Sequence, residues 1–398
     1  MDLTVESAAL LLLVAAVVAM AARRLRLPYS VGLVGAGIAL SFLPVSTQFP
    51  LTKDLLYTLL LPPLIFEAAF NMDWHHLRRD LVPIVTLATL GVVLSAAVTA
   101  VGMHYFADWP WVSAVTFGVL IAATDPVSVI ATFKESGVRG RLLLLVESES
   151  LLNDGTAAVL FSVVLAASAG GALGAWPIGV ELVVTIVGSV LCGALVAGAA
   201  LVLAGRTEDH LVEITLTTVA AYGSFLLAEH FQLSGVLAAL TAGLMMGNLV
   251  SMSSRGREAA QAFWEYAAFV ANSLVFLLIG VREARQDYRG AWWFALLAIL
   301  FVTLGRAVAV YPSCLLFRWS RLRVSGSHQH ALFWGGLRGA LALALALGLP
   351  VGVPLRNEIV TVSFAVVAFS IFVQGLTMSP LLRATGELRT REEIAGES

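Results

Sequence analysis

The chain has 398 residues, of which 59% are hydrophobic and only 13% charged, and its net charge is −2. Soluble globular proteins carry about 25% charged residues, so this composition excludes a soluble protein and indicates one that spans a membrane. The two cysteines, Cys192 and Cys314, lie in separate apolar segments and have neither metal-site nor disulfide-framework spacing.

Apolar segments recur along the whole chain. A helix needs about 20 predominantly apolar residues to cross a bilayer, and we predict about thirteen such spans. The first follows no basic segment and ends at Arg23-Arg24 rather than at a small-residue cleavage site, so we expect a spanning helix and not a signal peptide. The predicted spans are residues 7–22, 30–44, 54–70, 81–106, 111–133, 147–168, 178–204, 210–229, 234–250, 262–281, 291–317, 329–349 and 357–382.

The basic residues predict the orientation of these spans. With thirteen spans, 17 of the 24 lysines and arginines fall in loops on one side and five on the other, while Arg306 and Arg338 lie within spans. Loops rich in lysine and arginine remain in the cytoplasm. We therefore expect a multi-pass protein of the cell membrane with its N-terminus outside and its C-terminus in the cytoplasm.

Thirteen spans divide into six, one and six, and an odd connecting helix inverts the second half relative to the first. Inverted repeats with interrupted helices are typical of secondary transporters. We expect a first six-helix repeat in residues 1–170, a linking helix in 171–207, a second six-helix repeat in 208–383 and a short cytoplasmic tail in 384–398.

The fifth span of each half contains a predicted helix break. In the first half, AATDPVSV places Pro126 directly after Asp125, and a proline interrupts the helical hydrogen bonds. In the second half, WGGLRGALA places glycines on both sides of Arg338. A proline kink or a glycine packing face explains either sequence alone. Two breaks at matching positions, each with a charge, indicate a central site.

Four acids lie well inside the predicted spans: Glu67, Asp125, Glu149 and Asp154. A carboxylate at mid-bilayer costs roughly 2.5–3.5 kcal/mol on insertion scales, so such residues are functional candidates by default. In VESESLLNDG, Ser150, Asn153 and Asp154 are spaced i, i+3 and i+4 and therefore share one face of a helix.

Glu149 points elsewhere, because five residues separate it from Asp154 and place it about 140° around the helix. We expect it to pair with an arginine on a facing helix, and Arg338 is the predicted partner. Removing either member of such a buried pair costs about 3–5 kcal/mol.

The polar groups of this region are oxygen ligands. Thr124 and Asp125 add a hydroxyl and a carboxylate to Ser150 and Asp154, and broken helices expose backbone carbonyls. The absence of thiol and imidazole groups disfavours zinc, copper and iron, and calcium prefers more carboxylates. A small alkali cation therefore fits best. Glu67, one turn beyond a Pro-Pro pair in LLLPPLIFEAAF, either joins this site, gates the path to it, or reaches water at the membrane edge.

A carboxylate in a low-dielectric cavity disfavours its charged form. A proton or a cation neutralises it, but not both at once. Competition for Asp154, combined with alternating access of the site to the two sides, is therefore sufficient for exchange.

Four motifs carry a resemblance to a known family: ATDPVSV, ESLLNDG, GGLRGALALALAL and FSIFVQGLTMSPLL. In this order and spacing they resemble the sodium/proton antiporters, in the NhaP-like branch of the monovalent cation:proton antiporter-1 family, over about residues 5–385. The resemblance implies an all-α integral membrane protein with two inverted six-helix repeats, crossed broken helices 5 and 12, and a homodimer whose core domain moves past a dimerisation domain.

The resemblance also implies roles for the polar residues. Asp154 and Asp125 hold the ion and the proton, with Asp154 central, and Thr124, Ser150 and either a water or Glu67 complete the oxygen shell around Na⁺ or Li⁺.

Two further positions match the family pattern. Asn153 takes the place of the second aspartate of electrogenic relatives, which implies electroneutral exchange. Glu149 and Arg338 match the family's structural ion pair.

Other functions remain open on the sequence alone. Potassium/proton exchange uses the same ligands, and sodium-coupled symport of an organic solute is compatible with broken helices but needs a roomier polar cavity. An intramembrane aspartyl protease needs two acids that share a proton, yet the usual Gly-x-Gly-Asp stretch is absent. A channel needs a filter or a ring of charges. We expect a transporter rather than an enzyme, with no cofactor and no nucleic-acid partner.

Overall fold

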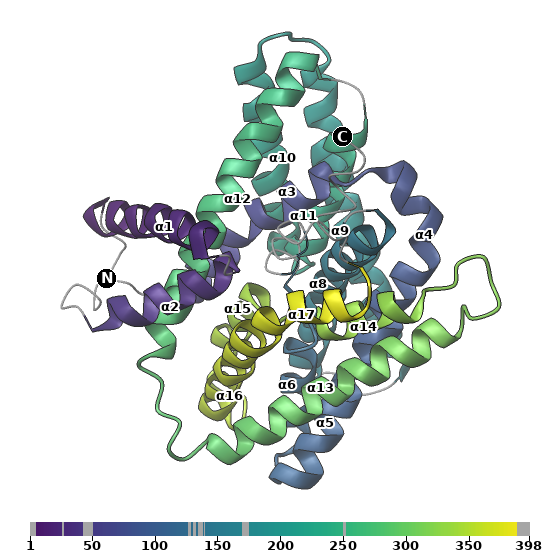
Figure 1. The fold of residues 1–398 in the computed structure, drawn as a ribbon. Helices are drawn as coiled ribbons and strands as arrows, with labels where there is room; N and C mark the ends of the chain where they lie inside the picture. Colours follow the sequence, from purple (N-terminus) through teal and green to yellow (C-terminus); the bar gives the residue numbers. More distant parts are fainter. Residues whose placement is uncertain are drawn as a thin grey trace.

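The computed structural model describes residues 5–25, 28–42, 51–125, 129, 133, 138, 140–168, 175–249 and 252–387. Within these ranges the chain forms helices and no strand (Figure 1). Seven of the described helical runs are long and apolar enough to cross a membrane, and four shorter apolar helices accompany them. The predicted all-helical membrane fold is confirmed.

Most predicted spans correspond to one helix or to a continuous helical run. The bounds are α1 Val5–Leu25, α2 Tyr29–Ser41, η2 Asp54–Leu60, α3 Leu61–Asn71, α4 Trp74–Thr86, η3 Leu87–Gly91, α5 Val92–Ala107, α6 Trp111–Leu120, α8 Arg141–Ser168, α9 Ala175–Ala204, α10 His210–His230, α11 Gly235–Asn248, α12 Ser254–Glu283, α13 Trp292–Leu315, α14 Gly326–Trp334, α15 Ala340–Leu347, α16 Arg356–Phe369, η4 Ser370–Gly375 and α17 Leu376–Ala384.

The three η segments are π-helical turns inside longer runs, and each lies close to a proline. At α3 the reason is clear. Pro63 lacks the N–H that an α-helix would offer to the carbonyl of Leu59. The hydroxyl of Tyr222 on α10 donates to that carbonyl at 2.9 Å instead. The π-helical turn before the Pro-Pro pair is therefore stabilised by a neighbouring helix.

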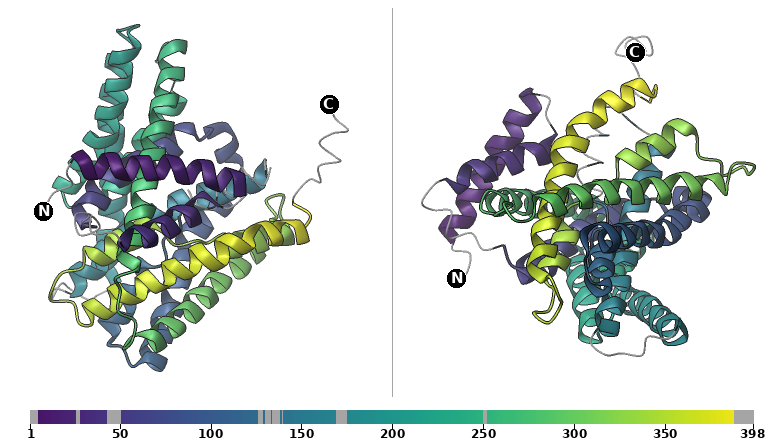
Figure 2. Two further views of the ribbon diagram at one scale, coloured as in Figure 1. Left: turned by 60° about the vertical axis from the view of Figure 1, so that its left-hand side comes forward. Right: turned by 90° about the horizontal axis from the view of Figure 1, so that it is seen from below.

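The described helices pack in two groups. One contains α1, α2, η2, α3 and α9 to α12, and the other contains α4 to α6, α8 and α13 to α17. In Figure 2 the C-terminal run α16–α17 lies alongside α13, and Figure 1 shows α13 beside α5. Helix α8 touches members of both groups, including α6, α4, α11 and α9. This central helix carries the ESLLNDG motif.

Glycines allow the closest helix contacts in the first group. A Cβ atom at Gly37 on α2 would lie 2.1 Å from the carbonyl oxygen of Leu277 on α12, and one at Gly247 on α11 would lie 2.0 Å from that of Phe70 on α3. Small residues let helix backbones approach in this way within membranes, where dispersion replaces the hydrophobic effect as the driving force.

Candidate ion-binding site

Two non-helical segments contact each other, one after α6 and the other between α14 and α15. Helix α6 ends at Leu120, and residues 123–125 are irregular; α14 ends at Trp334, and α15 begins at Ala340. The backbone N–H of Asp125 donates to the carbonyl of Leu337 at 2.7 Å, which joins the two segments. The break predicted at WGGLRGALA is present. The break predicted at Asp125-Pro126 begins before the proline, and Pro126 itself lies outside the described residues.

Glycine is required where the segments cross. A Cβ atom on Gly339 would lie 2.6 Å from the Cβ atom of Asp125 and 2.8 Å from its Oδ2. Real Cβ atoms do not approach other heavy atoms this closely. The glycine therefore permits the carboxylate of Asp125 to lie against the start of α15.

The two broken ends each meet a side chain of opposite sign. Arg338 donates from Nη1 to the carbonyls of Ala122 at 2.7 Å and Ala123 at 3.1 Å, just past the C-terminal end of α6. Asp125 lies at Gly339, the residue that precedes the N-terminal end of α15. A helix carries partial negative charge at its C-terminus and partial positive charge at its N-terminus. Both half-helix ends are thus electrostatically compensated inside the protein.

One face of α8 contacts the first broken segment. The side-chain oxygen of Asn153 accepts from the backbone N–H of Thr124 at 3.1 Å, and its Nδ2 donates to Thr124 Oγ1 at 2.6 Å. The hydroxyl of Thr124 donates to Ser150 Oγ at 2.9 Å. The amide of Asn153 therefore fixes the position of the threonine, and its second donor bond goes to Glu149 Oε1 at 3.1 Å.

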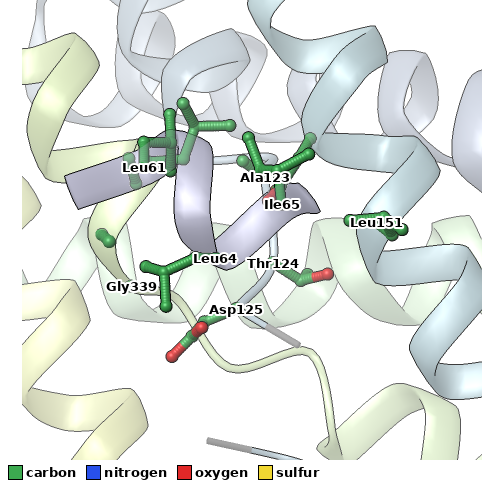
Figure 3. Close-up of a pocket in the computed structure, with 12 residues that line it drawn as sticks. Leu61, Leu64, Ile65, Ala123, Thr124, Asp125, Leu151 and Gly339 are labelled. Carbon is green, nitrogen blue, oxygen red and sulfur yellow. The ribbon is translucent and has the colours of Figure 1, made fainter. Parts of the chain in front are cut away.

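A small cavity lies between this segment, α8, α3 and α15. Figure 3 shows Thr124 and Asp125 on their irregular segment, with Leu64 of α3 and Gly339 beside them. About 20 Å³ is open to the centres of water-sized molecules, which is room for one water or small cation. The lining residues are Leu61, Leu64, Ile65, Ala123, Thr124, Asp125, Leu151, Asp154, Gly339, Ala340, Leu341 and Ala342.

Asp154 is the polar group in this cavity whose bonding is incomplete. Its side chain is buried, and its Oδ1 has no hydrogen-bond partner among the residues that the structure describes. A buried acceptor without a partner costs free energy, so an arriving proton or cation would remove a penalty at this oxygen.

The ion pair predicted between Glu149 and Arg338 is wrong. Glu149 pairs with Arg306 of α13, whose Nη1 and Nη2 lie 2.7 and 2.9 Å from the two carboxylate oxygens. Arg306 also donates to the carbonyl of Leu332 at the end of α14. The reason is geometric, because the Arg338 guanidinium is turned toward the carbonyls that follow α6. Gly336 in turn leaves room for Arg306: a Cβ atom at Gly336 would lie 2.5 Å from Arg306 Nε. Arg338 is still near enough to interact electrostatically with Glu149.

Glu67 does not line the cavity, although α3 also carries the lining residues Leu64 and Ile65. Its carboxylate accepts from Asn71 Nδ2 at 2.7 Å. Asn71 lines a separate and larger cleft between the α3–α4 connection and the start of α8, together with Asp73 and Glu147. Glu67 therefore lies outside the ion cavity and is hydrogen-bonded to a residue that lines the larger cleft.

The mouth of the larger cleft is charged. His76 hydrogen-bonds the Asp73 carboxylate at 2.7 Å, and this bond, followed by one from the backbone N–H of His75, lowers the pKa of Asp73. Asp73 is therefore an anion at neutral pH, and it lines the cleft.

Sequence reasoning missed Ser370, the first residue of η4. Its hydroxyl lies 3.1 Å from both the backbone N–H and the carbonyl oxygen of Arg338, and so holds the second broken segment in place. The signal was available, because Ser370 stands inside the FSIFVQG motif. In the part of the chain that the structure describes, no group of three or more His, Cys, Asp or Glu residues is arranged to bind a metal.

Comparison with known proteins decides the family. A family model described as "Sodium/hydrogen exchanger, transmembrane" matches residues 9–384. The chain belongs to the sodium/hydrogen exchanger family. This assignment confirms the resemblance drawn from the four motifs.

Individual relatives in the sodium/hydrogen exchanger family agree. The chain is 36% identical over 377 residues to the Na(+)/H(+) antiporter ApNhaP of Aphanothece halophytica, which covers 92% of this chain and 71% of the relative. It is 32% identical over 393 residues to the Na(+)/H(+) antiporter NhaH of Halobacillus aidingensis, with 95% and 96% covered. A solved structure of the sodium proton antiporter MjNhaP1 from Methanocaldococcus jannaschii superposes with a TM-score of 0.75 at 19% identity, covering 96% of each chain, and so shares the fold.

Proposed function

We propose that this protein exchanges Na⁺, or Li⁺, for H⁺ across the cell membrane, with one ion moved for one proton. The observation that carries the proposal is Asp154: its buried carboxylate has one oxygen without a hydrogen-bond partner among the described residues, and it lies in a cavity with room for a single small ion. The family and the names of its relatives support the same reaction.

Four residues are proposed to bind the transported species. Asp154 and Asp125 line the cavity and supply carboxylate oxygens, with Asp154 as the exchanging group. Thr124 lines the same cavity, and Ser150 is hydrogen-bonded to its hydroxyl, so the two supply or support neutral oxygen ligands. Asn153 positions Thr124 rather than binding the ion itself. Such oxygen donors suit a hard monovalent cation.

Exchange follows from the electrostatics of the cavity. An ionised Asp154 is costly in surroundings of low dielectric constant, and either a proton or Na⁺ removes that cost. The empty, charged form is therefore the form that crosses least readily between the two sides. A site that crosses only when it holds one of the two competing ligands couples their movements.

The uncharged Asn153 supports electroneutral exchange. Its Nδ2 donates to both Thr124 and Glu149, so an aspartate here would place a carboxylate against Glu149 and remove two donors. We expect Asn153→Asp to lower transport about tenfold or more without making it voltage-dependent. A variant that becomes voltage-dependent at near-normal rate contradicts this assignment.

The proposal includes the wider architecture. Alternating access is supported by the two groups of packed helices, with α8 between them. Two inverted repeats, residues 1–170 and 208–383, are supported by the packing of α5 on α13 and by the crossing at Asp125 and Leu337, because these elements fall at matching positions of the two halves. A homodimer with its N-terminus outside and its C-terminus in the cytoplasm completes the proposal.

The test uses purified protein in sealed liposomes that contain a trapped pH dye. External Na⁺, Li⁺ or K⁺ is added with the membrane voltage clamped or free. We expect Na⁺ to drive protons out at a rate independent of voltage, and Asp154→Asn to reduce that rate to the level of protein-free liposomes. Asp108→Asn is the matched control, because Asp108 is exposed in the turn between α5 and α6 and asparagine tolerates its left-handed conformation.

Each alternative gives a different result. Proton movement driven by K⁺ and not by Na⁺ would identify a potassium/proton antiporter. Proton movement driven by no cation, or an Asp154→Asn variant as fast as wild type, refutes the proposed mechanism. Sodium-coupled solute symport is disfavoured by the cavity, which has room for about one water molecule.

A further inference from the structure

A further cleft lies between the end of α13 and the start of α14, and it is distinct from both the ion cavity and the cleft at the α3–α4 connection. About 290 Å³ is open to the centres of water-sized molecules, more than ten times the 20 Å³ of the ion cavity. Its lining combines two arginines with apolar and small residues. The lining residues are Cys314, Leu315, Arg318, Arg323, Val324, Gly326 and Gln329.

The cleft is electropositive. Among the described residues, neither Arg318 nor Arg323 has a carboxylate partner for its guanidinium group. Gly326 is the first residue of α14, so the positive end of that helix also opens onto the cleft. Two unpaired arginines and a helix N-terminus together favour a phosphate group.

The surroundings of the cleft are those of a membrane border. Leu315, Leu316 and Trp319 expose 56%, 65% and 90% of their surface, and the Arg318 guanidinium lies over the Trp319 ring at 5.8 Å from its centroid. Tryptophan is enriched where membrane meets water, and exposed leucines one turn away offer contacts for acyl chains. A phosphate that carries acyl chains therefore suits this place better than a free phosphate ion.

The cleft is connected to the helix that carries Asp154. Arg141, the first residue of α8, donates to the carbonyls of Arg323 at 2.8 Å and Leu322 at 3.1 Å. The same guanidinium pairs with Asp80 of α4 at 2.7 Å. A ligand that orders the segment between α13 and α14 therefore acts on the start of α8.

We propose that this cleft binds the headgroup of an anionic phospholipid, with Arg318 and Arg323 on the phosphate and the acyl chains against Leu315 and Leu316. The bound lipid restrains the α13–α14 connection and, through Arg141, the position of α8. This lipid site is separate from the ion cavity and does not depend on which ion is transported.

The binding test uses the full chain in detergent, with phosphatidylglycerol as probe and phosphatidylcholine as the zwitterionic comparison, and retained lipid is counted by native mass spectrometry. Each arginine near an anionic lipid contributes about fivefold in affinity. We expect the Arg318→Gln/Arg323→Gln variant to retain phosphatidylglycerol about 25-fold more weakly than wild type. Arg321→Gln is the matched control, because Arg321 is exposed in the same connection but does not line the cleft.

Four outcomes overturn the proposal. Equal retention of the two lipids, or equal retention by the double variant and wild type, excludes this cleft as the lipid site. Displacement of phosphatidylglycerol by millimolar inorganic phosphate identifies a free-anion site instead. Retention that appears only when the chain is cut after Glu387 means that the C-terminal tail, which carries Glu392, Glu393 and Glu397, is the occupant.

The coupling to α8 is tested separately in proteoliposomes with and without phosphatidylglycerol. We expect the lipid to change the transport rate of wild type and Arg321→Gln, and to have at least fivefold less effect on the double variant. An equal lipid effect in all three proteins overturns the coupling. Because lipid retention is measured without transport, failure of the proposed antiport reaction leaves the binding result readable.

Discussion

The partner of Glu149 provides the sharpest test of the site's construction. The carboxylate is fully buried and receives two bonds from Arg306, at 2.7 and 2.9 Å, and one from Asn153 at 3.1 Å. Replacing Glu149 with glutamine leaves the buried guanidinium of Arg306 without its counter-charge. Breaking a buried pair in this way costs about 3–5 kcal/mol of unfolding free energy.

A double-mutant cycle separates the two arginines. We expect Glu149→Gln and Arg306→Gln each to destabilise by about 3–5 kcal/mol, and the double variant to cost about 2–3 kcal/mol less than their sum, because contacting residues are non-additive. In the cycle of Glu149→Gln with Arg338→Gln the coupling should stay below about 1 kcal/mol, since Arg338 is bonded to the carbonyls of Ala122 and Ala123.

Unfolding free energies are measured by titrating dodecyl sulfate into mixed micelles and following the fluorescence of the nine tryptophans. Arg306→Lys serves as the charge-conserving control, because lysine keeps the charge but not the two parallel bonds. A coupling larger for Arg338 than for Arg306 would refute the reasoning and restore the pairing expected from the sequence.

Two further predictions concern the elements that position the site. Gly339→Ala places a methyl group against Asp125. We expect the unfolding free energy to fall by about 1–3 kcal/mol because of overpacking, and exchange in liposomes to be at least tenfold slower. Gly352→Ala is the control and should change neither quantity, because no heavy atom lies within 4 Å of a Cβ atom at that position. Arg141→Gln removes two hydrogen bonds to Asp80, at 2.7 and 3.0 Å, in a partly exposed ion pair. We expect the unfolding free energy to fall by about 1–2 kcal/mol in the same titration. An unchanged midpoint would show that the pair does not anchor α8.

The sequence predicted the helices better than their ends. The span expected at 262–281 belongs to α12, which begins at Ser254. Hydropathy reports the part of a helix that lies in lipid, whereas the end is set by capping: Ser253 Oγ accepts from the N–H of Gly256, and Glu213 accepts from Ser253 in turn. Glu213 is 40 residues away from Ser253, so local sequence patterns carry no sign of this cap.

The site was predictable where one helix decides the geometry. The i, i+3, i+4 spacing places Ser150 and Asn153 on one face of α8, and both contact Thr124. Pairing across helices was not predictable in the same way. Periodicity gives the direction in which Glu149 points but not which of two arginines is there, because that depends on how α13 packs and on the turn of the backbone around Arg338.

The pair between Glu149 and Arg306 also sets an order for biogenesis. Glu149 is synthesised 157 residues before its partner, and translation proceeds at about 5–20 residues per second, so the acid waits roughly 8–30 s. Asp125 and the carbonyls past α6 wait longer still for Leu337 and Arg338. During that interval the Glu149 carboxylate has the amide of Asn153 as a hydrogen-bond donor but lacks its counter-charge, and the end of α6 lacks the guanidinium of Arg338. The first half therefore carries an uncompensated electrostatic cost that is removed only once α13 and the segment before α15 have been made.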